Sequence, residues 1–178
     1  AVKNKYYSQS YTIKGERKMN LSNDISLGFG GDYNYNSGDF KVKGNWGSSA
    51  KGHADNFGLY TNLGYKLNNN TIISAHLRGD SHKYSQENLT YKLNLTKKLN
   101  NFTFSLSEST GLRHPDLFAL HGKNPSGSYK SMKTTKAETS LSRELTAKYN
   151  FVDDIFFETT MYKGSISDVL NRGTSSNA

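Results

Sequence analysis

The sequence predicts an all-β protein built from antiparallel transmembrane β-barrel strands, and three observations support this. Apolar and polar residues alternate one by one along several stretches. These stretches run to about 10–14 residues, which exceeds the 5–6 typical of soluble sheets and suits a tilted strand crossing a bilayer. Short turns also alternate with long links along the chain. Because such strands face lipid on one side and a polar lumen on the other, mean hydropathy stays low, at -0.76.

The first four predicted strands cover about residues 3–17, 23–36, 54–67 and 71–80. The opening segment, AVKNKYYSQSYT, is already strand-like. In the second and third strands the apolar residues fall on one parity: Ile25, Leu27, Phe29, Tyr33 and Tyr35, then Phe57, Leu59, Leu63, Tyr65 and Leu67. The fourth strand is ambiguous, and we assign the face with Ile73, Ala75 and Leu77 to lipid, opposite His76 and Arg78.

The last four predicted strands cover about residues 87–99, 101–110, 134–150 and 154–168. The clearest alternation is in the fifth strand, where the residues Leu89, Tyr91, Leu93 and Leu95 share a face; Phe102, Phe104 and Leu106 follow in the sixth. Arg143 of the seventh strand falls on the parity of its apolar neighbours. A cation at the lipid midplane costs about 2–4 kcal/mol, so Arg143 lies near an interface or the register differs there.

The connections predict how the strands are oriented. Residues 67–70, 99–101 and 150–154 are tight turns rich in Asn and Asp, which tolerate the left-handed backbone of hairpins. Longer links cover residues 38–55, 81–87 and 111–134. Outer-membrane barrels have short periplasmic turns and long extracellular loops, so the long links are predicted to be extracellular.

Composition limits the function classes. The chain has no Cys, which excludes a disulfide framework and thiolate metal sites, and it has no apolar run long enough for a membrane helix. The net charge of +8 is interpreted as solvated lysines of lumen and loops. The sharper alternative is an electropositive lumen or mouth that attracts anionic ligands or lipopolysaccharide phosphates. The lysines are scattered and no nucleic-acid motif occurs, so no nucleic-acid partner is predicted.

No catalytic or metal site is predicted. His114 and His121 share one link with Asp116, but their spacing of seven matches no helical metal pair. None of the common hydrolase, zinc or phosphate-binding motifs is present, so we predict no enzyme activity, no metal and no cofactor. The ligand-contact candidates are His114, His121 and Trp46, whose ring stacks on a ligand or anchors at the interface.

Several motifs follow one another over roughly 115 residues, from 56 to 170. Residues 56–60 read NFGLY and residues 78–82 read RGDSH; residues 107–122 read SESTGLRHPDLFALHG, residues 136–145 KAETSLSREL and residues 166–170 ISDVL. In order and spacing they resemble TonB-dependent outer-membrane receptors, most of all the vitamin B12 receptor branch. The chain departs from the family pattern at His114, Ala137 and Arg143, where Ala, Pro and an aromatic residue are usual. The positions matching the family motifs are Gly111, Arg113, Pro115, Leu117, Leu120, Asn124, Pro125, Glu138, Ser140 and Glu144.

The resemblance implies an outer-membrane receptor that takes up a scarce nutrient, such as cobalamin or siderophore-bound iron, by energy-coupled transport. Its partners would be outer-membrane lipid, lipopolysaccharide, the small-molecule nutrient, and the inner-membrane TonB complex acting on a plug. Such receptors have about 22 strands. We therefore expect residues 1–178 to be part of a larger barrel, without the plug domain.

Two alternatives remain open at this stage. The chain could be a complete small eight-stranded barrel with a structural or adhesion role, because about eight strands are enough to close. Pairing between the first and last strands would distinguish it. A soluble β-rich binding protein is the other alternative, and it would stay folded without detergent.

Overall fold

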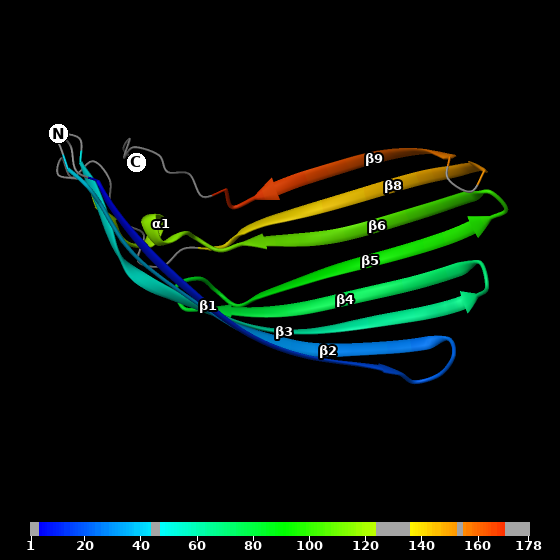
Figure 1. The fold of residues 1–178 in the computed structure, drawn as a ribbon, viewed down its shortest axis with the longest axis horizontal. Helices are drawn as coiled ribbons and strands as arrows, with labels where there is room; N and C mark the ends of the chain where they lie inside the picture. Colours follow the sequence, from blue (N-terminus) through cyan, green and yellow to red (C-terminus); the bar gives the residue numbers. More distant parts are fainter. Residues whose placement is uncertain (1–3, 44–46, 124–135, 153–154, 170–178) are drawn as a thin grey trace.

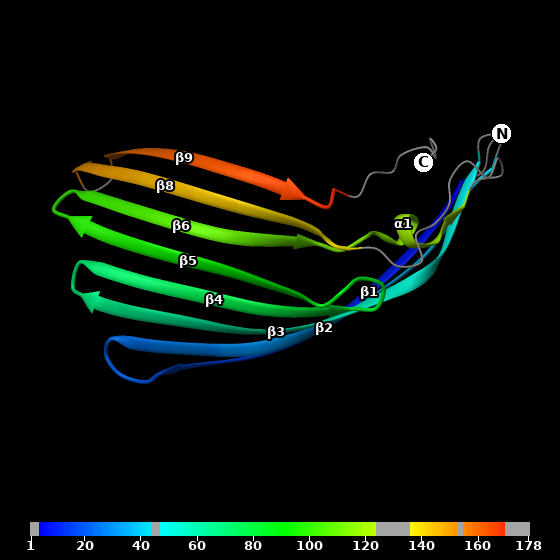
Figure 2. The same cartoon turned by 180° about the vertical axis from the view of Figure 1, so that it is seen from behind.

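The computed structural model describes residues 4–43, 47–123, 136–152 and 155–169. They form one curved, open antiparallel sheet with a single short helix near one end (Figures 1 and 2). In the described residues no helix is long and apolar enough to cross a membrane. The long strands are β1 Lys5–Asn20, β2 Ile25–Val42, β3 Ser48–Asn68, β4 Thr71–His82, β5 Asn88–Leu99, β6 Phe102–Arg113, β8 Glu138–Val152 and β9 Ile155–Ser167.

The topology is a simple meander. Each strand pairs with its neighbour in the chain, in the order β1-β2-β3-β4-β5-β6-β8-β9. The helix α1, Leu117–His121, leads into the two-residue strand β7, Gly122–Lys123, which pairs with β3. The predicted all-β class with antiparallel barrel strands is confirmed. Within the described residues β1 and β9 pair on one side only, so the cross-pairing that a closed small barrel requires is absent.

The register sorts side chains onto two faces, as the alternation predicts. One row across five strands consists of Ile73, Leu95, Leu106, Leu145 and Met161, which are neighbours through backbone pairing and are 40–70% exposed. We call the apolar outward face on these strands the apolar belt. The predicted lipid face of β4 is therefore the one observed.

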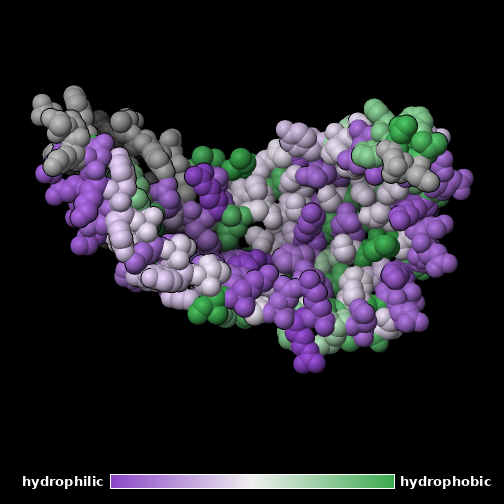
Figure 3. Space-filling model, in the orientation of Figure 1, coloured by the Kyte–Doolittle hydropathy of each residue, from purple (hydrophilic) through white to green (hydrophobic). Residues whose placement is uncertain are grey.

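The opposite face is polar and forms the inside of the curve, which we call the luminal face. Figure 3 shows a hollowed surface on which hydrophilic residues predominate. Small residues occupy many luminal positions, among them Gly28, Gly30 and Gly58, and leave room for longer side chains from adjacent strands. A protein with so small a buried core needs a surrounding medium that covers its apolar belt.

Two predictions about the connections are tested by the structure. Asn100 in the 99–101 turn has φ 51°, the left-handed conformation expected there. The predicted link 38–55 is wrong in extent, because β2 and β3 remain paired up to Val42 and Ser48. This extension has no apolar alternation because it lies beyond the apolar belt, where both faces of a strand meet polar surroundings.

Candidate functional site on the luminal face

A charged network lies on the luminal face around Arg78 of β4. Its guanidinium donates to both oxygens of Asp32 on β2, at 2.6 and 3.0 Å, and to both oxygens of Asp80, each at 2.8 Å. Asn56 Nδ2 also donates to Asp80 Oδ1 at 2.8 Å. The side chains of Asp32 and Asp80 are only 11% and 5% exposed. One cation thus holds two nearly buried carboxylates, a pattern that fixes the relative position of β2, β3 and β4.

Gly58 creates the space for this network. A Cβ atom at Gly58 would lie 2.1 Å from Arg78 Nη2, so only glycine admits the guanidinium in this place. On β4, Arg78, Asp80 and His82 lie two residues apart and therefore share the luminal face. All three belong to the RGDSH stretch. Their spacing of two residues along a strand predicts that their side chains share one face.

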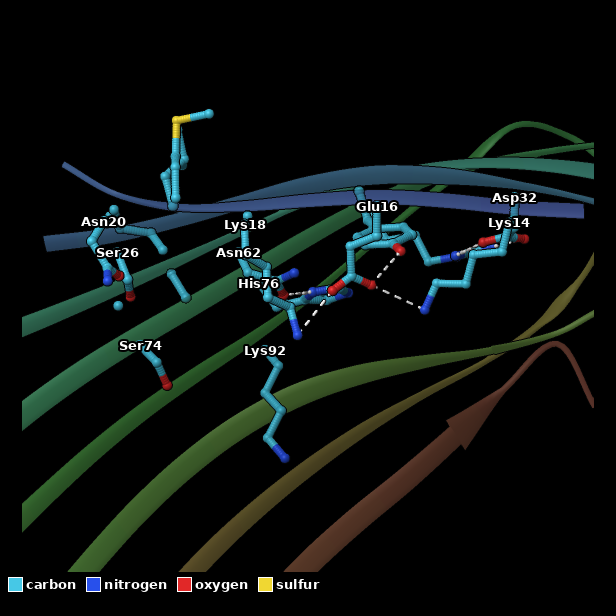
Figure 4. A pocket seen from close by; sticks show the side chains of 18 residues that line it. Lys14, Glu16, Lys18, Asn20, Ser26, Asp32, Asn62, Ser74, His76 and Lys92 are labelled. Atoms are coloured by element: carbon cyan, nitrogen blue, oxygen red, sulfur yellow. Dashed lines mark hydrogen bonds and ion pairs between the residues drawn. The ribbon is translucent and has the colours of Figure 1, made fainter.

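A second cluster lies on the luminal face of β1 and β3, on the side of the short turns. Glu16 accepts hydrogen bonds from Tyr60 Oη at 2.9 Å and forms ion pairs with Lys18 and Lys14 at 2.9 and 3.1 Å. These residues line a cavity of about 760 Å³ with Arg78, His76 and Lys92 (Figure 4). Cations outnumber carboxylates on this wall, as the hypothesis of an electropositive lumen requires.

Histidines gather at the end with the long links. The rings of His82 and His114 are stacked, with centroids 4.3 Å apart and planes at 10°. Ser85 Oγ lies 3.0 Å from His114 Nδ1. Both rings lie beyond the apolar belt. Burial and the nearby His114 lower the pKa of His82 to about 4, and burial also lowers the pKa of His114, so both are neutral at neutral pH.

The helix α1 is held against β3 beside this histidine pair. Asp116 caps it, because its Oδ1 accepts a hydrogen bond from Ala119 N at 2.7 Å. His121 at the other end packs edge-on against Tyr84, with centroids 5.2 Å apart. A Cβ atom at Gly52 would lie 2.2 Å from the His121 ring, so this glycine forms the slot that receives it. Tyr84 also packs against His82, with ring centroids 6.3 Å apart.

The stacked histidines line a luminal cavity of about 810 Å³, which we call the upper cavity. The carbonyl oxygen of Asn56, Oδ1, is buried there without a hydrogen-bond partner among the described residues. A buried polar atom of this kind is ready to accept a hydrogen bond from a ligand or water. The other lining residues are mostly aromatic, neutral polar or aliphatic, including Tyr6, Asn34, Asn36, Phe40, Pro115, Leu117 and Phe118.

The structure brings most of the sequence-predicted site residues to this end of the sheet. Gly111 and Ser140 are direct cross-strand partners, as are Arg113 and Glu138, whose side chains form an ion pair of 3.7 Å. Pro115 and Leu117 line the upper cavity, and Leu120 is 3% exposed. Glu144 shares the luminal parity of Ser142, whose hydroxyl donates to it at 3.4 Å. Trp46, Asn124 and Pro125 lie outside the described residues.

The two histidines predicted as ligand contacts lie in different places. His114 lines the upper cavity, whereas His121 lies in the slot at Gly52. In the part of the chain that the structure describes, no three His, Cys, Asp or Glu side chains are arranged to hold a metal ion. Sequence reasoning did not identify Asp32, Asn56 or Tyr60 as site residues, because their importance depends on which strands become neighbours.

Comparisons with known proteins agree with this fold. The family model described as "TonB dependent receptor-like, beta-barrel" matches residues 2–178. No curated protein matches the sequence. Among solved structures, a ferric enterobactin receptor (PfeA) of Pseudomonas aeruginosa is 20% identical with a TM-score of 0.77, over 90% of this chain and 27% of that one. The siderophore receptor PirA of Acinetobacter baumannii is 17% identical with a TM-score of 0.71, over 92% and 27%.

Proposed function

The chain belongs to the family of TonB-dependent receptor β-barrels, and from this premise we propose that it forms one sector of a larger barrel that imports a scarce nutrient. Members of the family are receptors in the outer membrane of Gram-negative bacteria and are not enzymes. The chain spans about a quarter of the length of the first solved structures that it matches. The activity of a whole receptor is therefore part of the proposal.

The upper cavity carries the proposal of ligand binding. It lies on the luminal face at the end with the long links, where a compound arriving from outside would first meet the barrel. Its aromatic rings offer apolar contact, while Asn34, Asn36 and the unpaired Asn56 Oδ1 offer hydrogen bonds. We propose that a small nutrient is held here, and siderophore-bound iron is the first candidate because the similar structures are siderophore receptors. The likeness to the vitamin B12 receptor branch stays a prediction.

The remaining partners follow from the same orientation. Outer-membrane lipid would contact the apolar belt, and lipopolysaccharide its extracellular half. The charged luminal cluster around Glu16 would face a plug supplied outside residues 1–178, and the inner-membrane TonB complex would act on that plug. The open edges of β1 and β9 support this arrangement, because a strand edge in lipid needs a neighbour to satisfy its backbone groups.

The decisive experiment is an uptake assay in cells that produce the complete protein carrying this chain. Radioactive iron on several siderophores, and labelled cobalamin, are supplied to cells with and without a functional TonB complex. We expect uptake of one of these compounds, lost when TonB is inactivated and reduced by Asn56→Leu, which replaces the amide that lines the upper cavity and holds Asp80 with an apolar side chain. Equal uptake of every compound in cells lacking the protein would contradict the proposal.

A further inference from the structure

The outward face contains a charged group around Arg143, the residue whose sequence parity places it among apolar neighbours. Arg143 Nε donates to Glu108 Oε2 at 2.6 Å, and Tyr91 Oη donates to Glu108 Oε1 at 2.6 Å. All three side chains lie on the parity of the apolar belt rather than on the luminal face. The register is therefore correct at Arg143, and the outward face of β5, β6 and β8 carries an ion pair among its apolar residues.

Lys163 adds a further cation to this group. It is the cross-strand partner of Arg143, so the two side chains extend from the same face of neighbouring strands. Among the described residues Lys163 has no ion-pair partner, and Arg143 uses only Nε, with its side chain 61% exposed. Glu108 balances one of the two positive charges. The group, which we call the outward cation site, therefore carries one unbalanced positive charge and unused guanidinium donors.

The height of the outward cation site follows from strand geometry. Arg143 is eight residues from Phe151, which begins the belt at the short-turn end. At about 3.3 Å per residue and a tilt near 45°, this places Arg143 about 19 Å above Phe151, within an apolar band about 25 Å tall. Two more outward residues, Leu141 and Thr139, lie above it on β8. The flexible ends of Arg143 and Lys163 can therefore extend to the extracellular interface, where a cation on the lipid face costs far less than at the midplane.

From this geometry we propose that Arg143 and Lys163 bind a phosphate group of lipopolysaccharide in the outer leaflet. The forked guanidinium suits two oxygens of one phosphate, and the ammonium of Lys163 supplies a second cation beside it. Glu108 and Tyr91 act as positioning residues. Glu108 accepts a hydrogen bond from Arg143 Nε and is itself held by Tyr91 Oη, so that among the described residues the Nη donors of Arg143 stay available. The proposal rests on the proposed orientation, in which the long links are extracellular.

The test uses the complete protein purified from outer membranes in mild detergent, with native mass spectrometry to count bound lipopolysaccharide. Two probes are supplied, lipopolysaccharide with intact phosphates and the same material after phosphatase treatment. We expect retention of the intact form, and about tenfold lower retention for the phosphatase-treated form and for Arg143→Gln with Lys163→Gln. Equal retention of both forms, or wild-type retention by the double variant, would overturn the proposal.

Two further variants keep the test decisive. Lys163→Gln alone leaves the Glu108–Arg143 pair intact, so it is informative even if the Arg143 variant inserts poorly; it should lower retention severalfold. Lys97→Gln is the matched control, because Lys97 is outward-facing and exposed near the short-turn end and should leave retention unchanged. Nutrient uptake by Lys163→Gln is measured in parallel. Uptake that persists while retention falls separates this site from the proposed transport function.

Discussion

At the scale of single residues, Arg78 shows how a barrel wall can hold charges without exposing them to lipid. Its guanidinium holds Asp32 and Asp80, which lie 46 and two positions away in the chain. Removal of one partner of such a group leaves a nearly buried charge uncompensated, at a cost of about 3–5 kcal/mol. The network therefore depends on Gly58, the position that makes room for it.

We expect Gly58→Ala to destabilise the complete protein by about 1–3 kcal/mol, because its Cβ would displace a guanidinium held by two carboxylates. Denaturant unfolding in detergent micelles measures the effect. Gly79→Ala is the control, since Gly79 is on the outward face of the adjacent strand and a Cβ there has no atom within 4 Å. Equal unfolding midpoints for the two variants would show that the Arg78 site tolerates displacement.

The stacked histidines predict a pH response at the end of the sheet with the long links. The pKa of His82 is about 4 in the folded protein against an ordinary 6.5, so the folded form binds fewer protons between these values. Stability at this site is therefore fully present above pH 6.5 and decreases as the pH falls toward 4. We expect faster hydrogen exchange of residues 80–86 over this range. His82→Phe keeps an aromatic ring without the titration, so its exchange profile should be flatter; an unchanged profile would assign the response to other groups.

At the scale of elements, the position of α1 depends on a contact with β3 rather than on helix propensity. A five-residue helix is too short to be stable alone, and its buried residues are Ala119 and Leu120. The His121 ring fits the slot at Gly52, while Leu117 and Phe118 line the upper cavity. Any movement of α1 would therefore change the shape of the cavity proposed to hold the nutrient.

We expect Gly52→Ala to displace His121 and release α1 from β3, because the new Cβ would lie 2.2 Å from the ring. Hydrogen exchange at Ala119 and Leu120 should increase, and binding of the transported compound should weaken. Gly15→Ala is the comparison, since a Cβ at Gly15 has no atom within 4 Å. Unaltered exchange in Gly52→Ala would mean that α1 is held by other contacts.

At the scale of the whole molecule, the sheet has two open edges and an apolar outward face. Only five hydrophobic residues of the described chain are buried, all of them Ala or Leu, while large apolar side chains along the belt remain exposed. An open sheet of this kind cannot satisfy its edge strands or cover its belt in water. Neighbouring strands and lipid are what the fold requires.

The isolated chain of residues 1–178 should therefore self-associate in detergent-free buffer instead of folding as a monomer. Analytical ultracentrifugation and circular dichroism of the refolded polypeptide measure this directly. A monodisperse, β-rich monomer in water would favour the soluble binding protein that the sequence left open. The complete protein in detergent should give a single folded species.

The sequence by itself determined which way each side chain faces, because successive residues of a strand point to opposite sides. The apolar parity of Leu93 and Leu95, the lipid-side parity of Arg143 and the left-handed turn at Asn100 are all readable from the chain. Only the tertiary structure decided which residues meet. Arg78 contacts Asp32 and His82 stacks on His114 because the strand register brings distant segments of the chain together. The register depends on many backbone pairings at once, so no local sequence pattern encodes it.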